Sequence, residues 1–355
     1  MSLFAQFQSK RVLLSPFDLI KAVSKQPLVL CAAWRAAVHD ACGPFEWITF
    51  AYLAWLTALM IICRHNIAHP ILHAIAQLAI AFAIVALAHS AQNSRSALIR
   101  FARHWYPLPL YIFFFEELQS LVHAIWPEWF DAYLVAFDHS LFGVHPSVWL
   151  SRFSSPGLND FMQFSYMTYF LYLVILPMIL YAKREYAAFW TVMVSTALAH
   201  YSVYVIAVLF PIESPYYSLA ALNKVALSGG YFTSLIGTIE HFGRVHGAAF
   251  PSAHVAGSMV AILASRRYRR WLFWVCVPFF ASMCFATVYG RYHYAADVLA
   301  GLLVGIVAFK IGITLTKTSD TASENLFLPA QIAEGAEIGD QEYEPVLTFI
   351  TDRAK

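Results

Sequence analysis

The sequence predicts an all-α membrane protein, a polytopic helix bundle with about eight transmembrane helices. The first observation is composition: the 355-residue chain is 60% hydrophobic and only 12% charged, whereas an ordinary soluble domain carries roughly 25% charged residues. The second is length, because several apolar stretches reach the ~20 residues that a helix needs to cross a bilayer. Together they place most of the chain in a membrane.

Hydropathy divides the apolar part of the chain into eight spans. In order, they are 44–63, 70–90, 105–126, 160–182, 187–210, 251–265, 271–289 and 294–316. The sixth is the shortest and begins at Pro251, a residue that suits the first turn of a helix. Two longer connections, 127–159 and 211–250, are expected to emerge on the same face of the bundle.

The two ends of the chain differ from this central part. The first 43 residues alternate apolar patches with Lys and Arg and lack the features of a secretory signal, which predicts an amphipathic segment on the cytoplasmic membrane surface. Residues 44–316 are the predicted transmembrane catalytic domain, with a core at about 100–316. The polar, acidic segment 317–355 predicts a disordered cytoplasmic tail.

Basic residues predict the orientation of the spans, since Lys and Arg accumulate on the cytoplasmic side. With eight spans, 18 of the 23 Lys and Arg fall on one face and five on the other. This asymmetry places both termini in the cytoplasm. Two spans separate His254 from His293, so both histidines are expected on the opposite face, whether that face is periplasmic, exterior or luminal.

Composition also argues against other classes of protein. A net charge of +2 is too small to indicate a nucleic-acid partner, and no basic run is interleaved with aromatic residues. The five cysteines show no paired spacing, so neither a disulfide framework nor a zinc site is indicated. No cofactor and no metal are expected.

Two short motifs place ionisable residues at the starts of apolar helices. The first is Phe250-Pro251-Ser252-Ala253-His254, and the second runs from Arg291 to Asp297 as Arg-Tyr-His-Tyr-Ala-Ala-Asp. Ionisable residues at a membrane segment are costly and mark a site by default. The alternative is a pair of interfacial histidines with packing or solvation roles.

The spacing within each motif predicts phosphoryl chemistry. Ser252 and His254 ring a helix N-terminus, whose free N–H groups attract anions. His293 and Asp297 are four residues apart on one helical face, so the carboxylate can orient the imidazole as a nucleophile. Arg291 can supply donors to a phosphoryl group, or it can simply anchor the helix end at the headgroups. For Ser252 the alternative to phosphate contact is helix capping.

These motifs resemble the type 2 phosphatidic acid phosphatase superfamily, whose signature includes Pro-Ser-x-His and, further on, His-x-x-x-Asp. The inositol phosphorylceramide synthase branch is the most similar, because its recurring forms Phe-Pro-Ser-x-His and His-Tyr-x-x-Asp match Phe250–His254 and His293–Asp297. The string Asp138–Gly143 and the prolines of Leu209–Pro215 also look like that branch. The resemblance covers roughly residues 100–316.

The resemblance implies a six-helix core and metal-independent phosphoryl transfer at a membrane surface. His293 would become the phosphohistidine, Asp297 would orient it, and His254 would protonate the departing oxygen and then activate the acceptor. The family's Lys-x6-Arg-Pro element is absent, and Ala286-Thr287 stands where the family has Ser-Arg. Arg291 is therefore the expected substitute, with Lys224 and Arg244 as further candidates for binding the phosphate.

Other polar residues are weaker candidates for a substrate pocket. Glu116 and Glu117 lie in the third predicted span and can either touch substrate or pair with a histidine such as His123 or His200. Asp138 can contact substrate or act as a turn residue. Tyr289, which ends the seventh predicted span, is a further pocket candidate.

The predicted function is a lipid phosphotransferase that moves a phospho-headgroup from a phospholipid donor to a lipid such as ceramide or diacylglycerol, or to water. A second interpretation is a phosphatase of phosphatidate or a polyprenyl pyrophosphate, using the same site. A third, from another class, is a proton-coupled transporter in which the His and Asp form a relay. A fourth is a metal site, because two histidines and an aspartate are adequate ligands. The sequence does not indicate an oligomeric state.

Overall fold

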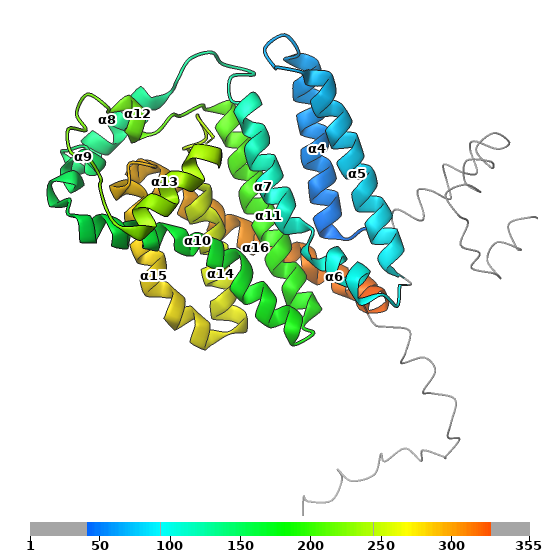
Figure 1. The fold of residues 1–355 in the computed structure, drawn as a ribbon. Coiled ribbons are helices and arrows are strands. Elements are labelled where there is room, and N and C mark those ends of the chain that lie inside the picture. The colour runs from blue at the N-terminus through cyan, green and yellow to red at the C-terminus, as the bar shows by residue number, and fades with distance from the viewer. Residues whose placement is uncertain (1–40, 93, 244, 328–355) are drawn as a thin grey trace, which may run out of the picture.

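The computed structural model describes residues 41–92, 94–243 and 245–327. The amphipathic segment predicted for residues 1–43, apart from its last three residues, lies outside the described residues, as does the predicted tail after residue 327. The described chain is helical and contains no β-strand (Figure 1). The predicted fold class, an all-α membrane bundle, is therefore confirmed.

Within the described part of the chain, six helices are long and apolar enough to cross a membrane. They are α4 (Pro44–Ile62), α5 (Pro70–Gln92), α10 (Pro156–Ala182), α11 (Tyr186–Leu209), α15 (Arg270–Tyr289) and the first part of α16 (Ala295–Phe327). The other two predicted spans are shorter helices, α7 (Pro107–Glu117) and α14 (Ala253–Tyr268). α16 continues to Phe327, past the predicted end of the last span at residue 316, so the start of the predicted tail is helical.

Shorter helices fill the connections that the hydropathy pattern leaves open. α6 (Ala97–Trp105) precedes α7, while α8 (Asp131–Phe142) and α9 (Pro146–Leu150) lie in the first long connection. The second connection contains α12 (Pro215–Ser218) and α13 (Tyr231–Gly243). Several helices begin at proline, whose fixed φ suits the first turn and whose missing N–H leaves no helical bond unmade.

The core of the bundle surrounds α11, which packs against α16, α14, α4 and α10 (Figure 1). α14 is in turn enclosed by α16, α15 and α10. Such close packing depends on small residues of α16: a Cβ on Gly301 would lie 2.7 Å from the carbonyl oxygen of Ser252, and one on Gly305 would lie 2.6 Å from that of Ala256. These two glycines, one helical turn apart, therefore let α14 pack closely against α16.

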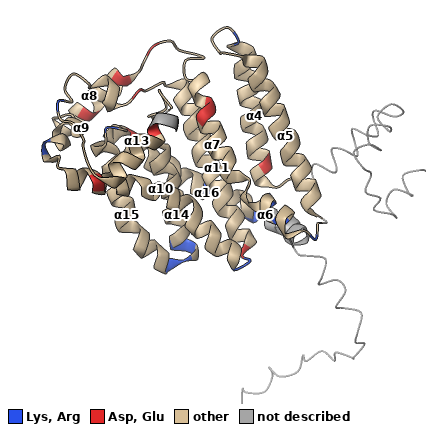
Figure 2. Cartoon of the chain, in the orientation of Figure 1, with Lys and Arg blue, Asp and Glu red and all other residues tan. Residues whose placement is uncertain are grey.

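The two long connections meet on one face, as predicted. The amide of Phe130 donates to the carbonyl of Pro211 at 2.9 Å, and Ile212 pairs with Ala248 in an isolated bridge. Basic residues are concentrated at one turn of the bundle. Figure 2 shows a basic patch where α14 meets α15, at Arg266–Arg270, while acidic positions lie on α7, α8 and α13 toward the other end.

Candidate active site

The two histidine motifs come together at one end of the bundle. α14 leaves that end at His254, and α15 returns to it just before His293, so the two imidazole rings lie edge to face with centroids 5.8 Å apart. The helical hairpin therefore brings the two motifs together on one side, as the span count predicts. This separation is compatible with both imidazoles acting on one phosphorus atom.

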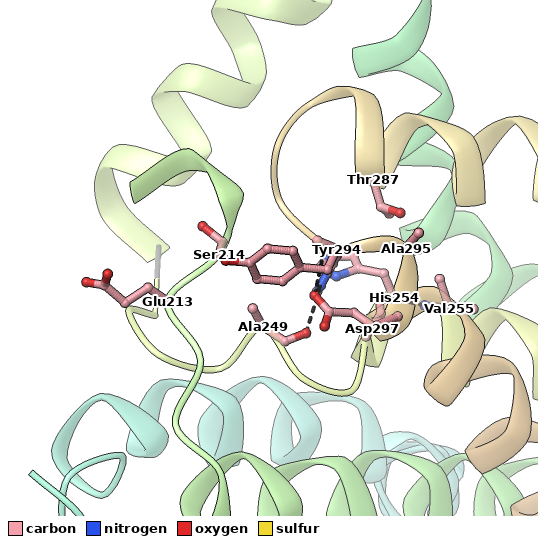
Figure 3. Close-up of polar contacts among 12 residues, drawn as sticks. Glu213, Ser214, Ala249, His254, Val255, Thr287, Tyr294, Ala295 and Asp297 are labelled. Carbon is pink, nitrogen blue, oxygen red and sulfur yellow. Dashed lines mark hydrogen bonds and ion pairs between the residues drawn. The ribbon is translucent and has the colours of Figure 1, made fainter. Parts of the chain in front are cut away.

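A backbone carbonyl and a carboxylate hold the ring of His293 in place. Its Nδ1 lies 2.8 Å from the carbonyl oxygen of Ala249 and 3.3 Å from Oδ2 of Asp297 (Figure 3). A carbonyl oxygen only accepts hydrogen bonds, so Nδ1 must carry the hydrogen. In the neutral ring, Nε2 then bears the lone pair, on the edge opposite to both partners.

Asp297 connects the two motifs through its backbone as well as its side chain. Its carboxylate accepts from the amide of Tyr294 at 2.8 Å, and its carbonyl accepts from the amide of Ser252 at 3.1 Å. The side chain is fully buried, and Oδ1 has no hydrogen-bond partner among the described residues. The start of α16 is thus fixed directly against the start of α14.

Two tyrosines of α10 position His254. The hydroxyl of Tyr166 lies 2.9 Å from Nε2 of His254, and the ring of Tyr169 packs against the imidazole with centroids 4.4 Å apart. The hydroxyl of Tyr169 is held in turn by Nε2 of His200 at 2.8 Å. A Cβ on Gly257 would lie 2.7 Å from the ring of His200, so the glycine makes room for it.

The N-terminus of α14 leaves two backbone donors available to a ligand. Ser252 caps the helix, because its Oγ accepts from the amide of Val255 at 3.4 Å and its carbonyl accepts from Ala256. The amides of Ala253 and His254 have no acceptor among the described residues, and both residues line the cavity described below. Ser252 itself does not line that cavity, so the structure supports its capping role.

Two buried aspartates of α8 form hydrogen bonds with residues around the second histidine motif. Asp131 accepts from the amide of Glu213 at 2.9 Å and from the hydroxyl of Tyr294 at 2.7 Å. Asp138 accepts from the amides of Ala295 and Ala296 at 2.8 and 3.0 Å, where it caps the N-terminus of α16. Asp138 was a candidate for the substrate pocket, but the structure places it behind the motif as a helix cap.

Of the basic residues predicted to bind phosphate, neither Arg291 nor Lys224 lines the cavity described below. Arg291 is buried, and its Nη2 donates to the carbonyl of Val225 at 2.7 Å. Burial lowers the pKa of Arg291, while the nearby Tyr216 and Tyr289 raise it. Lys224 is exposed on the loop between α12 and α13, and Arg244 lies outside the described residues. The Nε of Arg291 has no hydrogen-bond partner among the described residues, and its role in binding phosphate stays a prediction.

Three of the remaining polar candidates are now placed. Tyr289 is buried, with its hydroxyl hydrogen-bonded to Asn159, and it does not line the cavity. Glu117 contacts Nδ1 of His73 at 3.2 Å, which corrects the prediction of His123 or His200 as the partner of the glutamate pair. His73 belongs to α5, and the hydropathy pattern does not show that this helix lies beside Glu117. Glu116, by contrast, lines the cavity.

His254 and His293 open onto a cavity of about 420 Å³. Its far wall is apolar and comes from α7 and α10, through Leu108, Ile112, Phe115, Phe170, Leu173 and Val174. Ile112 and Phe170 are also exposed, at 61% and 44%, on the outside of the bundle. Glu213 and Ser214 also line the cavity, and both lie on the loop before α12 (Figure 3). The cavity is thus polar at the histidines and apolar toward the side of the bundle.

Sequence reasoning missed two partners of the histidines. The carbonyl of Ala249 carries no side-chain signal, although its position just before Phe250-Pro251 is suggestive of a turn. Tyr166 lies 88 residues before His254, and only the packing of α10 against α14 brings the two together. Among the described residues, no three or more His, Cys, Asp or Glu side chains are grouped so that they could hold a metal ion.

The fold and the site together define an integral membrane helix bundle with a buried His–Asp pair and a second histidine facing one cavity. The chain belongs to the PAP2 superfamily: the family model matches residues 132–311, half of the chain. The match includes both histidine motifs and runs from α8 to about the middle of α16. This membership indicates a phosphatase-type enzyme with lipid substrates in a membrane. No curated protein and no solved structure matches the chain.

Proposed function

We propose that this protein is a lipid phosphotransferase that moves a phospho-headgroup from a phospholipid to a second lipid through a phosphohistidine intermediate. The observation that carries the proposal is the orientation of His293. Because its Nδ1 hydrogen is held by Ala249, the lone pair at Nε2 is directed away from the protein backbone, as a nucleophile requires. Asp297 then stabilises the positive charge that develops on the ring.

The first half of the reaction breaks the bond between phosphorus and the glycerol oxygen of the donor. Nε2 of His293 forms a bond to phosphorus, and the departing alkoxide takes a proton from His254 to leave as diacylglycerol. The free amides of Ala253 and His254 can hold the phosphoryl oxygens during this step. The hydroxyl of Tyr166, in contact with Nε2, restrains the orientation of the His254 imidazole.

The second half discharges the phosphohistidine. His254, now neutral, removes the proton from a hydroxyl of the acceptor lipid, whose oxygen attacks phosphorus while the bond to Nε2 of His293 breaks. This returns both histidines to their starting protonation states. The reaction needs no metal and no cofactor, because the two imidazoles handle the nucleophilic attack and both proton transfers.

The shape of the cavity supports an amphiphilic substrate. Its apolar wall between α7 and α10 ends in Ile112 and Phe170, which are exposed on the side of the bundle. An acyl chain can lie along this wall while the headgroup phosphate reaches the histidines. The resemblance to the inositol phosphorylceramide synthase branch favours ceramide or diacylglycerol as the acceptor over water.

Charge asymmetry supports a site on the non-cytoplasmic face with both termini in the cytoplasm. The arginines of the α14–α15 turn lie at the end of α14 opposite to His254. Since such residues remain in the cytoplasm, the histidines would face the periplasm, the exterior or a lumen.

The decisive experiment is product analysis by lipid mass spectrometry, using purified protein, a phospholipid labelled with ³²P in the headgroup phosphate, and ceramide. The expected product is ceramide that carries the labelled phospho-headgroup of the donor. His293→Ala should lower its formation by at least about a thousandfold, roughly 4 kcal/mol in barrier. His89→Ala, on the exposed surface of α5, is the matched control.

Three results would contradict the proposal in different ways. Release of water-soluble phosphate with no transfer would identify a hydrolase. Solute flux in liposomes without any lipid product would identify a transporter. Full activity of His293→Ala would show that the nucleophile lies elsewhere.

A further inference from the structure

The cavity in front of the histidines is acidic. Three glutamates line it, namely Glu116, Glu213 and Glu240, and no lysine or arginine does so among the described residues. This is unexpected for a site that handles phosphate, because an anionic group is normally met by basic side chains. The charges of this cavity therefore indicate a substrate with a positive group as well as a phosphate.

The three glutamates come from three separate elements that converge on the cavity. Glu116 belongs to α7 and lies against the end of α13, where a Cβ on Gly243 would be 3.3 Å from its Oε1. Glu240 belongs to α13 and, together with burial, raises the pKa of Tyr292. Glu213 precedes α12 and contacts Nε2 of His246 at 3.0 Å. Because three separate elements each contribute a carboxylate to the same cavity, the negative charge is concentrated there.

Aromatic rings also line the same space. Tyr111, Tyr166, Tyr169, Tyr204, Tyr217 and Tyr292 all contribute to the wall of the cavity. The negative face of an aromatic ring attracts ammonium groups, and cages of such rings recognise quaternary ammonium ligands. Carboxylates and tyrosines together are therefore suited to a cation that also carries methyl groups.

The anion-binding part of the cavity is suited to a single negative charge. It consists of the amides of Ala253 and His254 and of the two histidines. The side chain of His293 is 7% exposed and lines the cavity. Because the carbonyl of Ala249 holds Nδ1 of this ring, Nε2 is the nitrogen that can meet a ligand atom.

We propose that the donor lipid carries a cationic amino-alcohol headgroup, of the choline or ethanolamine type, with its phosphodiester at the histidines and its ammonium group at the glutamates. This inference rests on the proposed function and specifies its substrate class. A neutral polyol headgroup would gain nothing from the carboxylates. A phosphate monoester or a pyrophosphate would bring two or more negative charges into an acidic cavity, where like charges repel.

The test compares donors that differ only in headgroup. Purified protein in neutral detergent micelles is given phosphatidylcholine, phosphatidylethanolamine, phosphatidylinositol or phosphatidate of the same acyl composition, with ceramide present. We expect kcat/KM for at least one of the two cationic headgroups to exceed that for phosphatidylinositol and phosphatidate by about tenfold or more. Equal or better turnover of phosphatidylinositol or phosphatidate would overturn the proposal.

Glutamine variants test whether the carboxylates cause this preference. Glu213→Gln and Glu240→Gln should each raise KM for the cationic donor by about fivefold to tenfold, with a smaller change in kcat, because the lost contact acts in binding. Glu128→Gln, in the exposed loop before α8, is the matched control. Tetramethylammonium should inhibit the native protein and inhibit Glu213→Gln less.

The outcomes separate the two proposals. If phosphatidylinositol or phosphatidate is used best and His293→Ala is inactive, the headgroup inference is wrong while the phosphotransferase proposal stands. If no donor gives a lipid product, the phosphotransferase proposal fails first. If the glutamine variants keep native KM values for every donor, the carboxylates do not select the headgroup, and the inference fails.

Discussion

His293 donates its Nδ1 hydrogen to the backbone carbonyl of Ala249 at 2.8 Å, a shorter contact than the 3.3 Å to the carboxylate of Asp297. The tautomer of the ring is thus set by an atom that no side-chain substitution removes. Asp297 adds charge and holds the turn through the amide of Tyr294. This division of roles changes what is expected of substitutions at Asp297.

We predict that Asp297→Asn slows the reaction by about a hundredfold. Where an aspartate alone fixes the tautomer, the same substitution costs ~10⁴-fold, but here the carbonyl of Ala249 keeps the hydrogen on Nδ1. The loss should come mainly from weaker stabilisation of the charged ring. Single-turnover rates measure it, with Asp160→Asn, which alters a contact with Thr233, as the control. A loss equal to that of His293→Ala would contradict this assignment of roles.

We predict that Tyr166→Phe lowers kcat by about tenfold and alters its pH dependence. The substitution removes the hydroxyl that lies 2.9 Å from Nε2 of His254, so the imidazole loses a positioning contact and its proton affinity changes. The measurement is kcat against pH for the native protein and the variant. Tyr172→Phe is the matched control, because Tyr172 is on the same helix and bonds the carbonyl of Cys276 outside the cavity. An unchanged profile would assign Tyr166 to packing alone.

The main features of the site follow from local sequence, because they depend on helical spacing. His293 and Asp297 are one turn apart, Pro251 marks a helix start, and two intervening spans bring His254 and His293 to one face. Hydropathy likewise locates the long spans. These inferences need only helical periodicity and the thickness of a membrane. They do not depend on contacts between residues that are far apart in the sequence.

The features that were not predicted depend on tertiary contacts. Tyr166 meets His254 only because α10 packs on α14, and Asp138 caps α16 from a helix that begins in a predicted loop. The hydrogen-bond partner of Arg291 was missed for a similar reason, since the carbonyl of Val225 lies 66 residues earlier. A basic residue beside a histidine motif suggests phosphate binding, but the surrounding fold decides which way its side chain points.

We predict that Gly301→Ala destabilises the protein by about 1–3 kcal/mol, the usual cost of overpacking, and lowers activity. The new Cβ would lie 2.7 Å from the carbonyl oxygen of Ser252. Because this oxygen belongs to the backbone, it cannot rotate away as the end of a side chain can. Displacing Ser252 moves His254 as well. Thermal unfolding in detergent measures the change. Gly237→Ala, where nothing lies within 4 Å, should be neutral or stabilising, because alanine favours the helix. Equal stability of both variants would contradict tight packing at Gly301.

The last prediction concerns Glu213, which is 20% exposed at its side chain and lies in the loop before α12. Burial raises the pKa of this carboxyl, the charge of Asp131 raises it further, and His246 and His123 lower it. The carboxylate form, which would bind the ammonium group, is therefore lost as pH falls through a value above the ~4.3 of an ordinary glutamate. We expect KM for the cationic donor to rise as pH falls through that range.

Two variants test whether this change of KM with pH comes from Glu213. Glu213→Gln should have a raised KM at every pH and no step at that position. His246→Gln removes a group that lowers the pKa of Glu213, so the step should move to higher pH, because less acid is then needed to protonate the carboxylate. The measurement is KM against pH for the cationic donor. A step that moves to lower pH in His246→Gln, or persists in Glu213→Gln, would mean that another group titrates.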